Sequence, residues 1–504
     1  MSDAAGKPGS QDARKRWLIL LSAAALVAAS AHGAELPDFG SPADAALSKS
    51  REAQIGRSVM LQLRNAGVVV DDPFLSEYLT TIGSQLATHV DNGDFNFNFF
   101  VVQDGSINAF ALPGGYIGVN SGLLLASESE NELAGVLAHE ISHVTQRHIA
   151  RAALDNQRTS IVSLAAMLAA LVLGASADMP GDAMTGIVSA SQGLAAQRQI
   201  NFTRATEAEA DRVGIELLSG AGFDPNGMSS FFEKLSRRYG GSSDAVPELL
   251  RTHPVSSDRV AEARDRARQL PATPHTSSPQ YALAKSRLIV LTAARPEEAF
   301  AQFRDKVDST LPEDRYGLAL ASMRMALYDN AEALFRGLVK DYPNIMAFRV
   351  GQAEAMAASG ATQPALDLYA ESIRLFPRNG PLTVSYAETL IAAGKPAEAH
   401  ELLLDLLNNE PPTAPQLRLI ARAANAEGDV ANAYFYMSYY YAAIGNLPLA
   451  IGQVRMALET PKSNDVDRAR FRSRLDQLIE YLPDEQRHLA NGDGPPRGGG
   501  RPPQ

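Results

Sequence analysis

The spacing of apolar residues in the first half of the chain predicts a mainly helical domain that contains a small sheet. Residues 52–89 place apolar side chains at helical intervals. Residues 95–102 alternate apolar and polar positions, as a half-buried strand does. Two more strand candidates, 108–112 and 116–120, are separated by Pro-Gly-Gly at 113–115, which is a strong turn signal.

From Ser127 the pattern becomes helical again, and we predict a helix that runs to Ala152. Ser127 and Glu130 have the spacing of a capping box at its start. A second helix is predicted over 206–218, ending at Gly220 or Gly222.

The stretch 161–174 between these two helices is almost continuously apolar. It is too short to span a membrane, so we expect a buried helix. A lid over a cleft and a peripheral membrane contact are the alternatives.

The second half of the chain repeats itself every 34 residues. The residues that recur are Ala331, Ala365, Ala399 and Ala433; Pro343, Pro377 and Pro411; and Gly360, Gly394 and Gly428. This is the period of the tetratricopeptide repeat, in which small residues let paired helices pack closely. Gly445 and Ala450 repeat the pattern after half a period, so the array either continues or ends in an irregular cap. We predict an all-α solenoid over 280–482, whose concave surface would receive clients or partner proteins.

The N-terminus has the order of a secretory signal. Basic residues at 14–16 precede an apolar run at 17–31 and a small-residue stretch ending at Ala34. A cleaved signal peptide is our prediction and an uncleaved anchor is the alternative; both imply export. The organisation we predict is a signal peptide at 1–34, a linker at 35–50, a first domain at 51–270, a linker at 271–279, the repeats at 280–482 and a disordered tail at 491–504.

Composition narrows the chemistry that the chain can perform. Its 45% hydrophobic and 20% charged residues are typical of a soluble globular protein. A formal net charge of -11 argues against a nucleic-acid partner, because neutralising phosphates needs a basic face. There is no cysteine, so disulfides, thiolate metal sites and cysteine nucleophiles are excluded. Any metal must be held by His, Asp and Glu.

His139, Glu140 and His143 form an HExxH sequence inside the predicted helix at 127–152. Four residues are a little over one helical turn, so both imidazoles lie on one face and can share a tetrahedral zinc ion. Glu140 can reach a water on that ion and accept its proton as general base. The same five-residue pattern also occurs by chance in ordinary helices, so a third ligand is needed to favour a metal site.

Glu207 and Asp211 are the candidates for the rest of the site. They share one face of the predicted helix at 206–218, so Glu207 can complete the metal site. Asp211 can then accept a hydrogen bond from the distal nitrogen of a ligand histidine. A His2Glu set with water is the open coordination of catalytic zinc. Glu209 points elsewhere and is expected in solvent, and His148 leans off the ligand face and is interpreted as an ordinary histidine.

His253 precedes Pro254 and therefore lies outside a regular helix. Its candidate roles are oxyanion stabiliser or fourth metal ligand, and a surface histidine is the alternative. The strand pair at 108–120 precedes the HExxH helix. It offers either an edge strand that binds an extended substrate or a purely structural hairpin.

Three segments together resemble the signatures of the HtpX-like and prenyl-protein-processing zinc metallopeptidases. They are Asn-Ala-Phe-Ala-Leu-Pro-Gly-Gly at 108–115, HExxH at 139–143 and Glu207-x-x-Ala210-Asp211. With a signal before them and repeats after them, the chain from Arg51 to Leu482 resembles the bacterial beta-barrel assembly-enhancing protease (BepA) family. The resemblance implies His139, His143 and Glu207 as ligands of one zinc ion, Glu140 as general base, a periplasmic location and outer-membrane protein clients.

The fold class we predict is mainly α: an α+β zincin-like zinc metallopeptidase domain with a small sheet at 51–270, followed by an all-α tetratricopeptide-type solenoid. The function it indicates is zinc-dependent endoproteolysis of exported proteins, with repeats that recruit clients or their assembly machinery. The main alternative is a chaperone or adaptor in which the repeats dominate and proteolysis is marginal. A scaffold with a vestigial metal site is a third interpretation. The enzyme is favoured because every group that the reaction needs is present.

Overall fold

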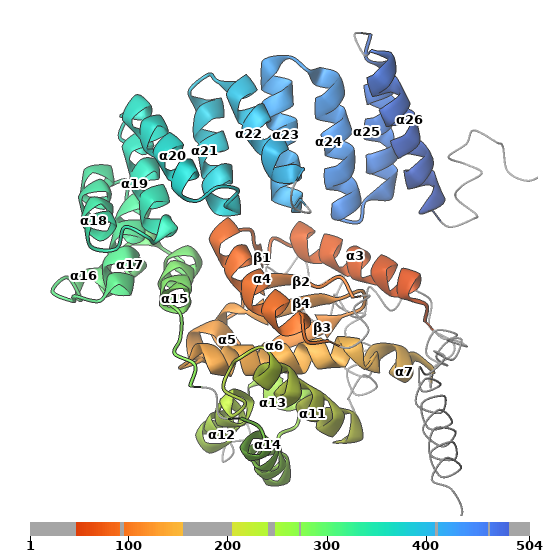
Figure 1. Cartoon of the computed structure of the whole chain (residues 1–504), viewed down its shortest axis with the longest axis vertical. Coiled ribbons are helices and arrows are strands. Elements are labelled where there is room, and N and C mark those ends of the chain that lie inside the picture. Colours follow the sequence, from red (N-terminus) through yellow and green to blue (C-terminus); the bar gives the residue numbers. More distant parts are fainter. Residues whose placement is uncertain are drawn as a thin grey trace, which may run out of the picture.

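The computed structural model describes residues 47–90, 95–154, 204–239, 247–271, 274–408, 412–461 and 464–482. The predicted signal peptide, the apolar stretch at 161–174 and the predicted tail at 491–504 lie outside the described residues. Figure 1 shows a lower body that contains the sheet, and an arc of helices that passes over it. In the described ranges, every helix is too short or too polar to cross a membrane.

The strands of the described residues form a four-stranded sheet in the order β1-β2-β4-β3. They are β1 (Val69–Val70), β2 (Asn98–Val102), β3 (Ala109–Leu112) and β4 (Tyr116–Asn120). β2 pairs with β4 in parallel, and β3 pairs with β4 antiparallel, so that β3 is an edge strand. The two strands predicted around 113–115 are confirmed. The strand predicted at 95–102 begins only at Asn98, and β1 is too short to produce a sequence pattern.

Five helices surround the sheet: α3 (Lys49–Asn65), α4 (Pro73–Ala87), α5 (Ser121–Ala126), α6 (Glu130–Thr145) and α7 (His148–Leu154). α3 begins inside the predicted linker at 35–50, where the Ser48 side chain accepts a hydrogen bond from the Arg51 amide. The turn at 113–115 lies against this helix. A Cβ on Gly114, whose φ is 82°, would lie 2.7 Å from Ala53 Cα.

The single helix predicted over 127–152 is in fact two helices, α6 and α7. Ser127 is the extended C-cap of α5, so the predicted capping box at Ser127 is wrong. The cap of α6 is Ser129, whose side chain accepts from the Glu132 amide. After α6 the chain turns at Arg147, which has a φ of 52°, and α7 then starts in a new direction. Left-handed backbone is uncommon for a residue other than glycine, and the sequence pattern gives no sign of it.

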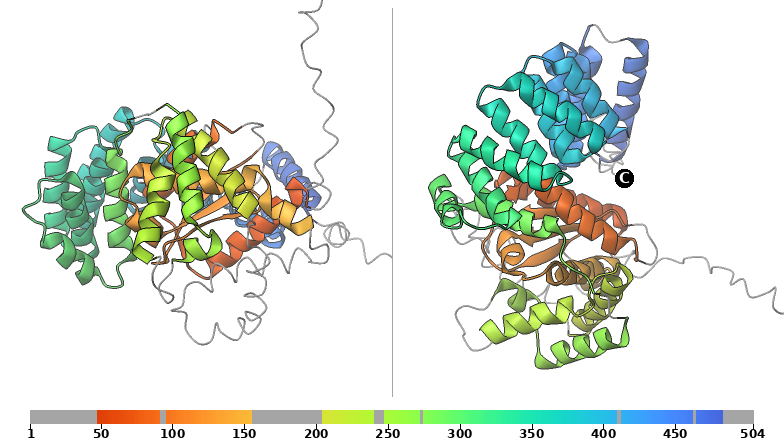
Figure 2. Two further views of the ribbon diagram at one scale, coloured as in Figure 1. Left: turned by 90° about the horizontal axis from the view of Figure 1, so that it is seen from below. Right: turned by 60° about the vertical axis from the view of Figure 1, so that its left-hand side comes forward.

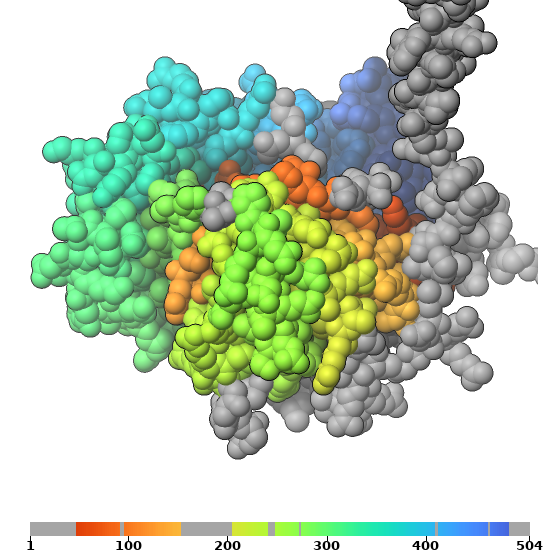
Figure 3. Space-filling view, turned by 60° about the horizontal axis from the view of Figure 1, so that its bottom comes forward, coloured from red at the N-terminus to blue at the C-terminus, as the bar shows by residue number. Residues whose placement is uncertain are grey.

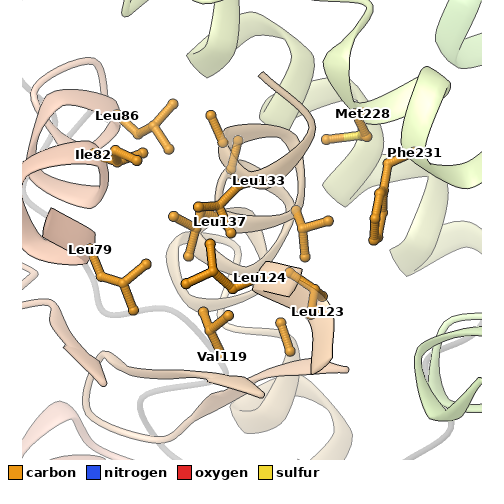
Figure 4. Packing of buried hydrophobic residues seen from close by; sticks show 14 of the residues in the cluster. Leu79, Ile82, Leu86, Val119, Leu123, Leu124, Leu133, Leu137, Met228 and Phe231 are labelled. Carbon is orange, nitrogen blue, oxygen red and sulfur yellow. The ribbon is translucent and has the colours of Figure 1, made fainter. Parts of the chain in front are cut away.

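The core of the lower body surrounds α6, as Figure 4 shows. Leu133 and Leu137 of α6 are fully buried, and Figure 4 places them between leucines of α4 and the residues Met228 and Phe231 of α12. Each fully buried leucine contributes about 1.5–3 kcal/mol, so α6 is firmly held.

Four further helices complete the lower body: α11 (Arg204–Gly220), α12 (Gly227–Tyr239), α13 (Glu248–Thr252) and α14 (Ser257–Gln269). They lie on the side of α6 that faces away from the repeats (Figures 1 and 3). The helix predicted at 206–218 is confirmed as α11, and of the two predicted ends, Gly220 and Gly222, the helix ends at Gly220.

The second half of the chain forms pairs of antiparallel helices. The pairs of the described residues are α15 (Pro279–Thr292) with α16 (Pro296–Arg304), α17 (Pro312–Arg324) with α18 (Tyr328–Asp341), α19 (Met346–Ala358) with α20 (Thr362–Leu375), α21 (Gly380–Ala392) with α22 (Pro396–Leu407), α23 (Ala414–Glu427) with α24 (Val430–Ala443) and α25 (Leu447–Glu459) with α26 (Asp465–Glu480). From α17 to α23 the first helices of successive pairs begin 34 residues apart, as predicted. The pattern at Gly445 is the turn into α25, so the array continues rather than ending there.

α15 joins the two bodies of the molecule, the lower body and the array of repeats, and does not follow a free linker. Its Tyr281 and Leu288 belong to the core around α6, whereas Leu283 packs among the repeats. The predicted linker at 271–279 is itself pinned, because the Ser278 amide and hydroxyl donate to the Glu130 carboxylate at 2.8 and 2.6 Å. The packing is therefore continuous across the predicted boundary.

A buried ion pair fastens α15 to α4. Arg287 donates to both carboxylate oxygens of Asp72 at 2.7–2.9 Å and to the Tyr316 hydroxyl at 2.9 Å. Its guanidinium also lies 4.3 Å from the centroid of the Phe74 ring. Asp72 is the N-cap of α4 and accepts from the Leu75 amide. Removing one charge of such a pair would leave the other buried without compensation.

The inner side of the arc is in contact with the lower body (Figures 1 and 2). α4 packs against α15 and α21, and Phe74 lies against a cluster that contains Val350 and Leu382. At the far end of the array the turn before α25 reaches α3. A Cβ on Gly445, whose φ is 86°, would lie 2.6 Å from the carbonyl oxygen of Arg57. The surface that we expected to receive clients is therefore occupied by the chain itself over this part.

Candidate metal centre

Three elements bring together four side chains that could hold a metal ion. α6 supplies His139 and His143, α11 supplies Glu207, and the C-cap of α13 is His253. One nitrogen or oxygen of each residue lies within 4.8 Å of the others, and all four side chains are buried. The predicted candidates thus meet at one point, although residues 139 and 253 are 114 positions apart in the chain.

The spacing of the four groups fits a single small cation. The Nε2 atoms of His139 and His143 are 3.0 Å apart, and His139 Nε2 lies 3.2 Å from His253 Nδ1. Glu207 approaches His253 Nδ1 to 3.1 Å and each of the other two histidines to 3.5 Å. Ligand atoms of a tetrahedral zinc with bonds of about 2.0–2.1 Å lie about 3.3 Å from one another. The arrangement can therefore hold a metal ion without rearrangement of the backbone.

Glu140 lies beside this group and is completely enclosed, with 1% of its surface exposed. Its Oε1 is 3.6 Å from His253 Nε2. Among the described residues no group donates a hydrogen bond to that oxygen. Burial raises the pKa of Glu140, and the nearby His253 and His139 oppose this effect. A carboxylate with a raised pKa and an unsatisfied oxygen is suited to accept a proton.

Asp211 supports His139 from behind. Its Oδ1 lies 3.0 Å from His139 Nδ1, the atom from which we predicted that it accepts a hydrogen bond, although the geometry of this contact is that of an ion pair and not of a hydrogen bond. Arg259 of α14 holds Asp211 with two hydrogen bonds of 2.8 Å and also approaches Glu207 Oε2 to 2.9 Å. The same guanidinium donates to the Pro254 carbonyl at 2.8 Å, next to His253. Arg259 thus ties α11 to the loop that carries His253.

The charges around the site favour a cation. Burial alone would lower the pKa of His139, but the carboxylates of Asp211 and Glu207 raise it to about 10. Burial also opposes ionisation of Glu207, yet His253 and His139 hold its pKa well below the usual range. Burial and the neighbouring His139 lower the pKa of His143. The carboxylates of the cluster therefore stabilise positive charge at its centre, which a bound metal ion can supply.

The position of His148 contradicts our interpretation of this residue as an ordinary histidine. It is 1% exposed, and its Nδ1 lies 2.7 Å from His143 Nδ1. Glu209, which was expected in solvent, accepts from His148 Nε2 at 3.2 Å and from Arg151 at 2.8 Å. The change of direction at Arg147 turns His148 back under α6, so a helical projection of the sequence places it on the wrong side.

Comparison with known proteins places this site in a family. Residues 73–267 match the model of peptidase family M48, and residues 356–423 match a tetratricopeptide repeat model. The chain is 35% identical over 450 residues to the putative beta-barrel assembly-enhancing protease of Vibrio cholerae. The aligned residues cover 88% of this chain and 92% of the relative. The chain belongs to the beta-barrel assembly-enhancing protease family. The predicted enzyme class, a metallopeptidase, and the predicted mainly α fold class are thereby confirmed.

Two further relatives match the chain over different lengths. The beta-barrel assembly-enhancing protease of Escherichia coli K12 is 32% identical over 457 residues, or 88% of this chain and 91% of the relative. The metalloprotease LoiP of the same organism is 32% identical over 200 residues, which cover 38% of this chain and 72% of LoiP. The M48 match ends within α14, so Arg259 lies inside the matched segment.

A cavity of about 340 Å³ adjoins the metal-binding group. It lies between α3, the turn at 113–115 and the end of α6, and His143 is part of its wall. Lys49, Arg57 and Arg147 line it together with Glu52, so cationic side chains outnumber anionic ones. The neighbouring β3 is the edge of the sheet and packs against α6.

Sequence reasoning missed two residues of this site, His148 and Arg259. The first depends on a left-handed turn that the pattern did not reveal. The second is 48 positions from its partner Asp211, in a helix that carries five other arginines or aspartates. A signal existed only for Arg259, which follows His253-Pro254 by five residues and can fold back onto that loop.

Proposed function

We propose that the chain is a zinc endopeptidase that uses His139, His143 and Glu207 as metal ligands and Glu140 as general base. The observation that carries the proposal is the convergence of His139, His143, Glu207 and His253 in a buried cluster that fits a single cation. Bound zinc supplies Lewis-acid activation of a water molecule and of the scissile carbonyl. A His2Glu set is the ligand set of catalytic zinc sites.

Glu140 performs the proton transfers of the reaction. Its raised pKa brings the carboxylate closer to the working pH, where it accepts the proton of the attacking water. The same proton then passes to the amine that leaves. The enclosing helices exclude bulk water, which strengthens these electrostatic interactions.

His253 acts as a fourth ligand in the resting arrangement. Its Nδ1 lies as close to His139 and Glu207 as the other ligand atoms do, which supports this role over a surface position. In its alternative role His253 would stay nearby and stabilise the oxyanion.

The substrate is an extended segment of protein that lies along β3. β3 is an edge strand that packs next to α6, and the cavity at its end adjoins His143. The clients we propose are outer-membrane β-barrel proteins, because the relatives are named for enhancing β-barrel assembly. The predicted signal peptide at 1–34 supports a periplasmic location.

The proposal is tested by metal content and casein cleavage of the mature chain. We expect one zinc per chain in both the wild type and Glu140→Gln, with cleavage lowered at least about 100-fold in the variant. Absence of zinc from the wild type would overturn the proposal. His253→Ala separates the two roles of that residue, because loss of a fourth ligand should raise cleavage whereas loss of an oxyanion stabiliser should lower it.

The chaperone or adaptor alternative makes a different prediction in cells. If the repeats alone carried the function, Glu140→Gln would restore assembly of the client proteins as well as the wild type does. A purely proteolytic role requires that the variant fails.

A further inference from the structure

The two ligand histidines of α6 are supported by different partners. His139 Nδ1 faces the carboxylate of Asp211, which Arg259 holds inside the protein. His143 Nδ1 faces a second imidazole, that of His148. The support of His143 then passes to Glu209, whose side chain is 30% exposed. One ligand is thus anchored within the core, and the other is anchored through a relay that reaches the surface.

The relay fixes the proton on each ring nitrogen. An ionised carboxylate only accepts hydrogen bonds, so Glu209 requires a proton on His148 Nε2. The Nδ1 atoms of His148 and His143 lie 2.7 Å apart, which is a hydrogen-bond distance, so a proton lies between them on one of the two rings. A His143 that binds metal through Nε2 carries its proton on Nδ1, and it therefore donates to His148 Nδ1. His143 Nε2 is then left with its lone pair directed at the other three ligands.

The backbone around the relay leaves His148 little freedom. The residue is the first of α7 and follows Arg147, which holds its left-handed conformation with its side chain against α3. Arg147 donates to the Leu47 carbonyl at 2.5 Å and lies 3.2 Å from the Glu52 carboxylate. His148 itself is 1% exposed. The imidazole is therefore placed by the fold rather than drawn in by a ligand.

We propose that His148 is a positioning residue that holds His143 in the tautomer able to bind metal, and that Glu209 sets the tautomer of His148. The inference rests on the proposed function, since it assumes that His143 is a ligand. Outer partners of ligand histidines fix the ring orientation and increase the basicity of the ligand, and their loss costs about 10–100-fold in metal affinity.

The test compares two substitutions of similar size in the full mature chain. His148→Gln keeps an acceptor for His143 and a donor for Glu209, whereas His148→Leu keeps neither. We expect the zinc dissociation constant, measured by competition with a chelator, to rise about 10–100-fold in His148→Leu and to stay within about threefold of the wild type in His148→Gln. A mere packing role would give the opposite order, because leucine fills an enclosed site better than a polar side chain.

The repeats provide a matched control. His400 of α22 is 9% exposed and pairs with the Glu427 carboxylate at 2.5 Å, so it has similar chemistry far from the site. His400→Leu should leave zinc affinity unchanged. ¹⁵N chemical shifts of the wild type should show His148 protonated at Nε2 and unprotonated at Nδ1; the reverse tautomer would overturn the proposal, even if His148→Leu failed to fold.

The outcomes distinguish the inference from the proposed function. If the wild type binds no zinc, the proposed function fails and the relay has no metal site to serve. If the wild type binds zinc and cleaves casein while His148→Leu retains wild-type affinity, only the relay is overturned. Weakened binding in His148→Leu with rescue by His148→Gln supports it.

Discussion

The lower body and the repeats differ in how far apart along the chain their contacting segments lie. In the repeats each helix packs mainly against the helices before and after it, and the pairs recur every 34 residues. In the lower body the site depends on contacts between distant segments, such as His139 with His253 and Asp211 with Arg259. Local packing lets damage stay local, as in other repeat proteins, whereas a site assembled from distant segments depends on all of them at once.

The largest effect is expected where the two bodies meet. Arg287→Ala leaves Asp72 buried without its partner, so we expect the free energy of unfolding to fall by about 3–5 kcal/mol. The two bodies should then unfold in separate transitions in urea, followed by circular dichroism. Arg336→Ala, which breaks an exposed pair with Glu332, is the control and should cost less than about 0.5 kcal/mol. A single transition with unchanged midpoint in Arg287→Ala would show that the two bodies are not coupled through this pair.

A matched pair of cavities tests the comparison directly. Leu137 of α6 and Leu403 of α22 are both fully buried, so either change to alanine should cost about 2–5 kcal/mol. Leu137→Ala should also weaken zinc binding, because it loosens the helix that carries both ligand histidines. Leu403→Ala should leave zinc binding unchanged, as measured by chelator competition. Equal effects of the two variants on zinc affinity would contradict the difference between local and distributed packing.

The smallest effect concerns the pH dependence of the metal-free chain. Although burial opposes it, the carboxylates of Asp211 and Glu207 raise the pKa of His139 to about 10, above the value of about 6.5 in an unfolded chain. The protonated histidine therefore adds stability that is complete below pH 6.5 and is lost as the pH rises through 10.

We expect chelator-treated protein to lose stability progressively between pH 6.5 and 10 in urea titrations. His139→Gln should remove this part of the dependence, and so should saturation with zinc, since the metal replaces the proton. A wild-type dependence equal to that of His139→Gln would mean that the histidine is not protonated in the folded state.

The same contrast explains how much the sequence could predict. The repeats were predictable in type and period because every pair restates the same local pattern, as at Ala365 and Gly394. The HExxH helix and Glu207 were predictable because helical spacing alone puts the key groups on one face. The position of the His148 side chain was not predictable, since it depends on the backbone conformation at Arg147. The order of the strands was not either, because the parallel pairing of β2 with β4 is decided by packing between separated segments.

The contact between Gly445 and Arg57 has a consequence for how this family can evolve. Solenoids usually gain or lose repeats freely, since each new pair needs only its neighbours. Here the array is attached at two points, by α15 at its start and by the turn before α25 near its end. An extra or missing pair would rotate and shift that turn away from α3. The number of repeats between the two attachments is thus set by the dimensions of the peptidase domain.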